Sequence, residues 1–276
     1  MQPRIVTLTS AKIREISRVA LEGYWKQIVL FMFFYYLITT GVSNVLNIFF
    51  VSYQQIPFGD TGEFLDRNIY YGSSIYSALV SGPLSWGLSK FLLDFFRYQK
   101  VNQTTLLDGF SNFSRTVFLM LLMSAKIFLW ALLFVIPGII ATFRYSQAFY
   151  VMVDHPEYSA NQCLKESTRI MTGNKLKYVY LNLSFIGWHL LAGLPALCFS
   201  GMLASASPVT AVLLDILFSI PILFVNAYLN VAVTVFYELA IDNLTIVEEM
   251  EAAAPAEEPY VPPVLEEKSE EKEFNE

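Results

Sequence analysis

The sequence predicts an all-α membrane protein, a polytopic bundle of about six transmembrane helices with amphipathic helices on the cytoplasmic surface. Composition is the first reason: 55% of the 276 residues are hydrophobic and only 15% are charged, whereas an ordinary soluble domain is about 25% charged. The second reason is that several long apolar runs contain no charged residue. About 20 consecutive apolar residues are enough for a helix to cross the hydrocarbon core of a bilayer.

Charge divides the chain into regions. The net charge is −6, yet residues 248–276 hold eleven Glu against two Lys, so the remainder of the chain is mildly basic. We therefore expect an N-terminal amphipathic helix within residues 1–26, a six-span domain over residues 27–240 and an acidic cytoplasmic tail over residues 241–276. The tail is rich in Glu and Pro, a composition typical of disorder.

The first element is a short amphipathic helix over residues 10–22. Ile13 and Ile16 lie on one helical face, and Arg14 and Arg18 lie elsewhere. Such a pattern is typical of a helix that rests on a membrane surface.

Six apolar segments follow. They lie at about residues 27–50, 71–96, 116–136, 138–153, 178–200 and 212–237. A single helix in place of the third and fourth segments would be roughly 57 Å long at 1.5 Å per residue, which is too long for a core of about 30 Å. We therefore predict that Pro137 and Gly138 break the helix and that a hairpin forms there.

Basic residues set the predicted orientation, because loops rich in Lys and Arg stay in the cytoplasm. Cations precede the first span and recur between the second and third and between the fourth and fifth, whereas the alternate loops hold only Arg67. The predicted protein is thus a multi-pass protein of the cell membrane with both termini in the cytoplasm. Similar short polar segments before the first and fifth spans also indicate a weak internal repeat.

Polar residues inside the spans are the candidates for function, because ionisable groups at that depth usually face a protein interior or a water-filled cavity. Lys126 and Arg144 both fall roughly 15 Å from the predicted cytoplasmic boundary, at 1.5 Å per residue. One hypothesis is that they line a polar cavity that accepts an anion such as a lipid phosphate. The other interpretation is that both cations are structural. The remaining members of the hypothesised interior are Asp215, Asn182, Asn226 and Asn230.

Enzyme and metal motifs are missing from the sequence. There is no HExxH zinc motif, no GxSxG nucleophile turn, no phosphate-binding P-loop and no paired-carboxylate motif. The two Cys and two His residues are isolated, so we expect no metal and no cofactor. Basic and aromatic residues belong to the spans and their borders, which argues against nucleic-acid binding. The expected partners are the lipid bilayer and either an anionic lipid or a membrane protein.

Several short motifs carry a family resemblance. They are the run IPGII, the turn Asp154-x-Pro156, the stretch Met171-x-Gly173-Asn174-Lys175 and the run LSFIGW. With these motifs the chain resembles an uncharacterised family of bacterial integral membrane proteins, domain of unknown function nine-seven-five, common in Gram-positive bacteria. The resemblance implies a multi-pass membrane protein and supplies no catalytic residue. We expect structural roles for the motif residues Pro137, Gly138, Asp154, Pro156, Gly173, Lys175, Gly187 and Trp188, with Asp154 capping the helix that follows it.

Three classes of function stay open at this point. The first is the binding or movement of a small or lipid anion through the polar interior. The second is a non-catalytic partner or scaffold subunit of another complex, docked through the surface helices or the acidic tail. A membrane-embedded enzyme ranks last, because no reactive set of residues is visible.

Overall fold

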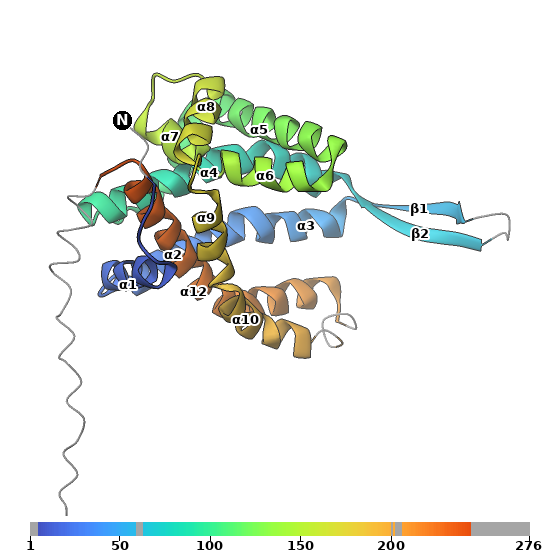
Figure 1. The fold of residues 1–276 in the computed structure, drawn as a ribbon. Coiled ribbons are helices and arrows are strands. Elements are labelled where there is room, and N and C mark those ends of the chain that lie inside the picture. The colour runs from blue at the N-terminus through green and yellow to red at the C-terminus, as the bar shows by residue number, and fades with distance from the viewer. Residues whose placement is uncertain (1–4, 59–62, 200, 202–205, 244–276) are drawn as a thin grey trace, which may run out of the picture.

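In the computed structural model, the chain forms a bundle of helices with a β-hairpin extending from one end (Figure 1). The structure describes residues 5–58, 63–199, 201 and 206–243. The helical elements are α1 (Ser10–Leu21), α2 (Trp25–Tyr36), the π-helix η1 (Leu37–Gly41), α3 (Val42–Phe49), α4 (Tyr71–Tyr98), the 3-10 helix η2 (Gln103–Asn112), α5 (Phe113–Leu133), α6 (Val135–Tyr145), α7 (Ala148–Asp154), α8 (Ala160–Ile170), α9 (Lys175–Leu183), α10 (Ile186–Cys198) and α12 (Pro208–Ala240). The strands are β1 (Val51–Phe58) and β2 (Glu63–Tyr70).

The predicted helical class is confirmed. Within the described residues, four stretches are long and apolar enough to cross a membrane, judged by length and composition: Trp25–Phe49, Gln103–Leu133, Lys175–Cys198 and Pro208–Ala240. They coincide with the first, third, fifth and sixth predicted spans. The second predicted span corresponds to α4, and the fourth corresponds to α6 with α7. These helices do not meet the combined criterion of length and apolar composition.

The β-hairpin was not predicted. Strands β1 and β2 pair antiparallel, from Val51 opposite Tyr70 to Phe58 opposite Glu63, and they connect α3 to α4. Both strands contain the aromatic and β-branched residues that favour extended backbone. Next to the hairpin, α3 packs along α4, and Phe31 of α2 stacks on Phe91 of α4 with nearly parallel rings.

The hairpin of α5 and α6 is confirmed, but its break lies elsewhere than predicted. Phe134 is the extended residue between the helices (φ −161°, ψ 153°), and Pro137 lies in the first turn of α6, where proline is tolerated because that N–H has no helical partner. Gly138 serves packing instead: a Cβ there would lie 2.7 Å from the Cβ of Ala131 on α5. Gly138 therefore allows α5 and α6 to pack closely, and it does not interrupt the helix.

A second break separates α6 from α7. The backbone N–H of Gln147 donates to Ser167 Oγ on α8 at 3.2 Å, and Ser167 Oγ donates to the carbonyl oxygen of Arg144 at 2.9 Å. A single buried hydroxyl thus satisfies a donor and an acceptor that the break exposes.

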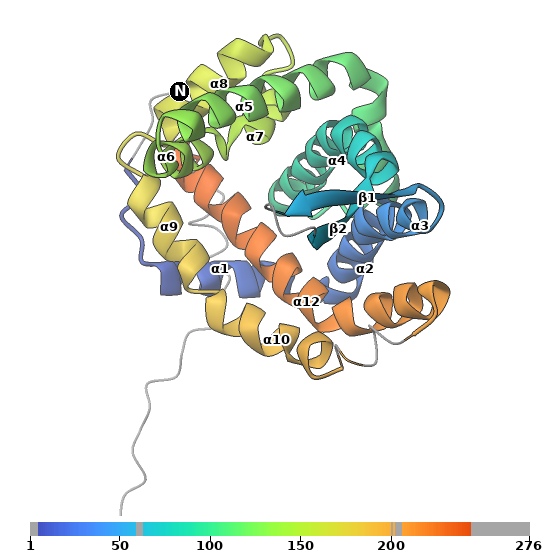
Figure 2. The same cartoon turned by 90° about the vertical axis from the view of Figure 1, so that its right-hand side faces the viewer.

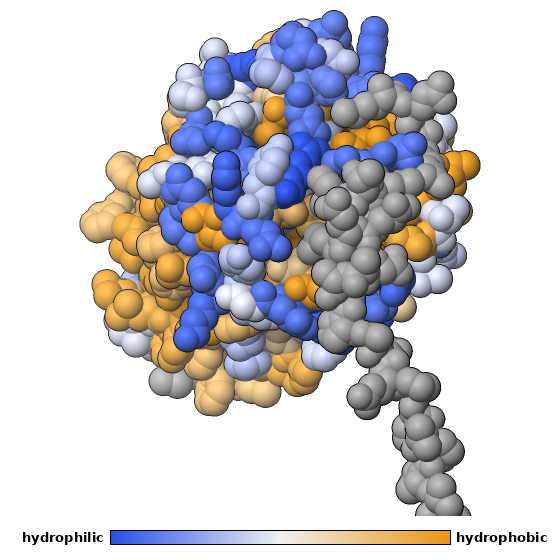
Figure 3. Space-filling view, turned by 90° about the vertical axis from the view of Figure 1, so that its left-hand side faces the viewer, coloured by the Kyte–Doolittle hydropathy of each residue, from blue (hydrophilic) through white to orange (hydrophobic). Residues whose placement is uncertain are grey.

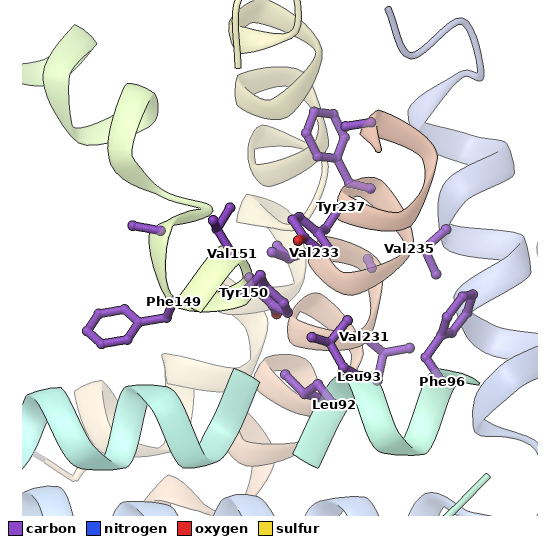
Figure 4. Packing of buried hydrophobic residues seen from close by; sticks show 14 of the residues in the cluster. Leu92, Leu93, Phe96, Phe149, Tyr150, Val151, Val231, Val233, Val235 and Tyr237 are labelled. Carbon is purple, nitrogen blue, oxygen red and sulfur yellow. The ribbon is translucent and has the colours of Figure 1, made fainter. Parts of the chain in front are cut away.

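Helix α12 is the centre of the fold. It contacts α1, α2, α4, α9 and α10, and Figure 2 shows it crossing the middle of the bundle. Every residue from 231 to 240 is buried. In Figure 4 the side chains of α12, α7 and α4 meet there, where Tyr150 and Tyr237 stack with ring centroids 5.1 Å apart.

Helices α1 and α8 are equivalent elements, which supports the internal repeat. Three pairs of residues, each 150 apart, show the match: Thr9 and Ser159, Ser17 and Ser167, Gly23 and Gly173. The first pair caps the two helices through side-chain oxygens, the second pair is fully buried, and the third pair has φ of +79° and +85°. Hydrophilic side chains gather at the end of the bundle where α1 and α8 lie, with apolar surface beside them (Figure 3).

Candidate functional site

The two cations predicted inside spans lie in the group formed by α5, α6 and α8. Lys126 Nζ donates to Asn161 Oδ1 of α8 at 2.7 Å. The Arg144 guanidinium lies 5.8 Å from the ring centre of Trp130, a cation–π contact. Its buried Nε has no hydrogen-bond partner in the part of the chain that the structure describes. The contacts at both cations are to protein groups of this one corner of the bundle.

The predicted polar residues of α12 lie together on another side, facing α2, η1 and α3, and Asn226 Oδ1 also lies 3.1 Å from His189 Nε2 of α10. Asp215 Oδ2 accepts hydrogen bonds from Tyr36 OH at 2.7 Å and from Asn44 Nδ2 at 3.0 Å. Asn226 and Asn230 line a cavity of about 170 Å³ with residues of α2 and η1. The structure thus divides the hypothesised interior: three of its members line one seam, while the two cations lie elsewhere.

The other predicted residues have local roles. Asn182 does not join the seam, because its amide nitrogen donates at 2.8 Å to the carbonyl oxygen of Tyr178 within α9. Gly173 follows α8 with a φ of +85°, a conformation that favours glycine, and Lys175 is the first residue of α9. A Cβ added at Gly187 would meet no atom within 4 Å, so packing does not require glycine there.

Asp154 does not cap the following helix as predicted. Ser159 caps α8, and its hydroxyl and the side chain of Gln162 form a reciprocal capping box. Pro156 lies in the turn between α7 and α8. The carboxylate of Asp154 is turned to other partners instead, because an Arg and a Tyr hydroxyl lie within hydrogen-bond distance.

Those partners belong to a buried ion cluster that joins the ends of α4, α7 and α12. Arg97 donates two hydrogen bonds to Asp154 at 2.7 and 2.9 Å, and its Nε donates to Glu238 Oε1 at 2.7 Å. Tyr237 OH also donates to Asp154, at 2.8 Å, and Asn243 donates to Glu238. Burial opposes the charge on Arg97, but the Asp154 and Glu238 carboxylates outweigh it and raise the pKa of Arg97. The geometry indicates a structural role, in which the cluster holds the ends of α4, α7 and α12 together.

A cationic groove lies beside α1. It encloses about 420 Å³, and it is lined by Arg14, Glu15 and Arg18 of α1, Trp188 of α10 and Tyr228 of α12, with a single Ala completing it. The hydroxyl of Tyr228 donates to the backbone oxygen of Arg14 at 2.8 Å and so ties α1 to α12. Glu15 is paired with the Lys one turn earlier on α1, which leaves the two arginines to dominate the charge of the groove.

The arginines of the cationic groove keep unused donors. Within the described residues, Arg14 Nη1 donates one long hydrogen bond, of 3.4 Å, to the carbonyl oxygen of Ser184. Its Nε is buried and has no partner among the described residues. Arg18 is exposed. A guanidinium with free donors binds carboxylate or phosphate groups well, because it presents paired N–H groups in a fixed plane.

An apolar pocket adjoins the groove. It encloses about 230 Å³ between Trp25, Trp188, Phe224, Val225 and Tyr228. Trp188 and Tyr228 line both cavities, and Trp25 packs against the ring of Phe224 with centroids 6.5 Å apart. A cationic surface and an apolar surface therefore meet at two shared side chains.

One family model matches the chain twice, over residues 7–140 and 132–243, and its description is a protein of unknown function (DUF975). The chain belongs to the DUF975 family. This confirms the resemblance drawn from the motifs. No curated protein and no solved structure matches the chain significantly. With a family of unknown function and four apolar helices, this DUF975 protein is a membrane-associated protein whose activity has to be argued from its sites.

Sequence reasoning missed the cationic groove of this DUF975 protein. Arg14 and Arg18 entered as polar residues of an amphipathic surface helix and not as a site, although their spacing of four residues places both on one helical face. The four-residue spacing of the two arginines was the sequence signal that could have predicted the groove. The apolar partner Trp188 was expected to have only a structural role as a motif residue. No group of three or more His, Cys, Asp and Glu residues in the described ranges is placed to hold a metal ion.

Proposed function

We propose that this DUF975 protein binds an anionic lipid with a phosphate headgroup in the cationic groove and the adjoining apolar pocket. The observation that carries the proposal is that Trp188 and Tyr228 are walls of both cavities. A headgroup beside Arg14 and Arg18 and an acyl chain beside Trp25 can therefore belong to one molecule. The proposed role is non-catalytic.

The proposal includes six membrane spans and cytoplasmic termini. Helix α4 and the pair α6 and α7 complete the six, and α4 at 28 residues is about 42 Å long at 1.5 Å per residue. Basic residues favour the α1 end as the cytoplasmic side. Tryptophans concentrate at the headgroup level of membranes, which agrees with Trp25 and Trp188 beside the groove. The groove then opens onto the cytoplasmic leaflet, which carries anionic lipids.

The expected preference follows from the two arginines. A Lys or Arg near an anionic leaflet contributes about 1 kcal/mol, and more when it bonds a phosphate directly. Neutralising Arg14 and Arg18 together should therefore weaken the binding of an anionic lipid relative to a zwitterionic one by about tenfold or more, because about 1.4 kcal/mol is a factor of ten.

Native mass spectrometry of the protein released from its own membrane in mild detergent tests this function. The double variant Arg14→Gln and Arg18→Gln should lose a retained anionic lipid that the unaltered protein keeps. The matched control is Lys126→Met with Arg144→Met, which removes two cations outside the groove and should keep the lipid. The reverse result would favour the anion cavity hypothesised around Lys126 and Arg144. Retention of no anionic lipid by the unaltered protein would contradict both.

A second candidate is a non-catalytic partner subunit, favoured by the acidic composition of residues 248–276. A strongly acidic segment attracts basic partner surfaces. Deleting residues 248–276 distinguishes the two candidates in the same experiment. Loss of a protein subunit bound in fixed stoichiometry would support the partner role, whereas loss of lipid only in the groove variants would support lipid binding.

A further inference from the structure

A polar stripe runs along α12, on the side away from the cationic groove. Its members follow one another at steps of four or seven residues and so lie along one slowly turning face of the helix. They are Asp215, Ser219, Asn226, Asn230, Thr234 and Glu238. The rest of α12 is strongly apolar. Polar groups on such a helix require protein partners, water or a ligand.

The cavity of about 170 Å³ lies midway along this stripe, between α12 and the π-helix η1. Its polar lining consists of hydroxyl and amide groups, from Tyr35, Tyr36, Thr39, Thr40, Asn226 and Asn230. Met32 and Leu223 complete the lining, so no cationic side chain lines the cavity. A site of this size and polarity has room for an ion and ordered water. π-helical turns are frequent at functional sites.

Asp215 places a negative charge in the seam outside the cavity lining, one hydrogen bond away from the lining residue Tyr36. Its Oδ2 accepts from two neutral donors, Tyr36 OH and Asn44 Nδ2, and the ion pairs among the described residues do not include it. Tyr36 lines the cavity and bonds the carboxylate, so it connects the two. Asp215 therefore has no cationic partner among the described residues. A carboxylate without a counter-charge inside a membrane span is costly in free energy.

A second group without a partner in the described residues lies one helical turn from Asn44, which bonds Asp215. Asn47 lies three residues beyond Asn44 on α3, which places both on one helical face. The side-chain oxygen of Asn47 is buried and accepts no hydrogen bond among the described residues. Buried acceptors are nearly always satisfied by protein, water or an ion. The orphaned oxygen and the unpaired carboxylate are both groups that a positive ligand would satisfy.

We propose that a monovalent inorganic cation binds in this polar seam, with Asp215 as its counter-charge and the hydroxyl and amide oxygens of the cavity as its neutral ligands. The donor set consists of oxygen atoms, which suit hard cations. Divalent ions take several carboxylates or phosphates as ligands, and the seam offers one carboxylate. An anion is excluded by the negative charge and the lack of a cationic side chain in the lining.

This site is independent of the proposed lipid function. The seam is built by α2, η1 and α3 with one side of α12. The cationic groove is built by α1 and α10 with another side of the same helix. The two cavities share no lining residue, although Asn226 of the seam bonds His189 of α10 at 3.1 Å. Variants at Asp215 or Asn230 avoid that contact, so each proposal can fail alone.

Thermal unfolding of the full chain in detergent tests the cation site, with sodium, potassium and choline chloride compared at equal concentration. Chloride and ionic strength then stay constant, and choline is too large for close coordination. A cation that binds the folded protein raises its unfolding temperature, so we expect a saturable upward shift with sodium or potassium over choline. Asp215→Asn keeps an oxygen acceptor for Tyr36 and Asn44 but removes the charge, and it should abolish the shift.

Two further variants make the result specific. Arg14→Gln with Arg18→Gln should keep the full cation shift, because the groove lies outside the seam. Asn230→Leu should reduce the shift while leaving Asp215 in place, which covers the case in which Asp215→Asn does not fold. An equal effect of choline, no shift with either metal ion, or an unchanged shift in Asp215→Asn would overturn the proposal.

Discussion

Replacing Arg97 by Met tests whether the buried ion cluster holds the ends of α4, α7 and α12 together. Met keeps much of the length and apolar volume of the side chain but removes the guanidinium. Asp154 and Glu238, whose side chains are 8% and 0% exposed, would remain as two carboxylates without a cation. Removal of one partner from a buried pair costs about 3–5 kcal/mol, because the remaining charge is uncompensated. With two acids left behind, we expect a loss at the upper end of this range.

The assay is unfolding by increasing SDS in mixed micelles, followed by circular dichroism. Lys90→Met is the matched control, because Lys90 lies on the same helix and is paired with Asp108 at 2.7 Å in a bridge that is much more exposed, with side chains 33% and 42% accessible. Exposed pairs contribute about 0–1 kcal/mol. A third variant adds Asp154→Asn and Glu238→Gln to Arg97→Met, and it should recover most of the lost stability because no buried charge is left.

Two results would refute this reasoning. One is a cost for Arg97→Met no larger than that for Lys90→Met. The other is a triple variant as unstable as Arg97→Met itself, which would assign the loss to packing and not to charge. Recovery in the triple variant separates the two causes, since it leaves the packing defect at Arg97 unchanged.

Three shorter predictions follow from the same contacts. Ser167→Ala should cost about 1–3 kcal/mol in SDS unfolding, because it leaves backbone groups unpaired at the break between α6 and α7; Ser17→Ala should cost less, since that hydroxyl bonds only within its own helix. Gly109→Ala should destabilise strongly, because its Cβ would overlap the backbone of α4, whereas Gly187→Ala should be neutral or stabilise by up to about 1 kcal/mol. Cys163 is fully buried and burial raises the pKa of its thiol, so maleimide labelling at Cys163, located by mass spectrometry, should appear only after unfolding, whereas the exposed Cys198 can react before it.

The apolar helices were predictable from the sequence because hydropathy is a local property. The first predicted span, residues 27–50, corresponds closely to Trp25–Phe49, and the amphipathic helix over residues 10–22 corresponds to α1. A glycine after a helix is equally local, and Gly173 has the positive φ that its position indicates. In each case the deciding interactions lie within a few residues of the pattern itself.

Pairings across the fold were not predictable, because nothing local encodes them. Arg97 is separated from Asp154 by 57 residues and from Glu238 by 141. The prediction that Asp154 caps a helix was reasonable from its neighbours, but a buried cation competes for the carboxylate more strongly than backbone N–H groups do. The break at Phe134 was missed for a similar reason, because the contact of Gly138 with α5 shows only in three dimensions.

The internal repeat supplies an independent test of the proposed lipid site. Residues 150 positions after Arg14 and Arg18 are Leu164 and Thr168 on α8, and α8 forms the same capped, buried helix without an arginine at either of these two positions. The scaffold therefore does not require the two cations, which favours a role in binding.

We accordingly expect the swap Arg14→Leu with Arg18→Thr to change stability by less than about 1 kcal/mol, as surface substitutions do, and to abolish retention of the anionic lipid. The opposite swap is not a matched control, because Leu164 is 1% exposed and an arginine there would bury a charge in the core. An unstable first swap would mean that the arginines hold α1 in place, and the proposed function would lose its main support.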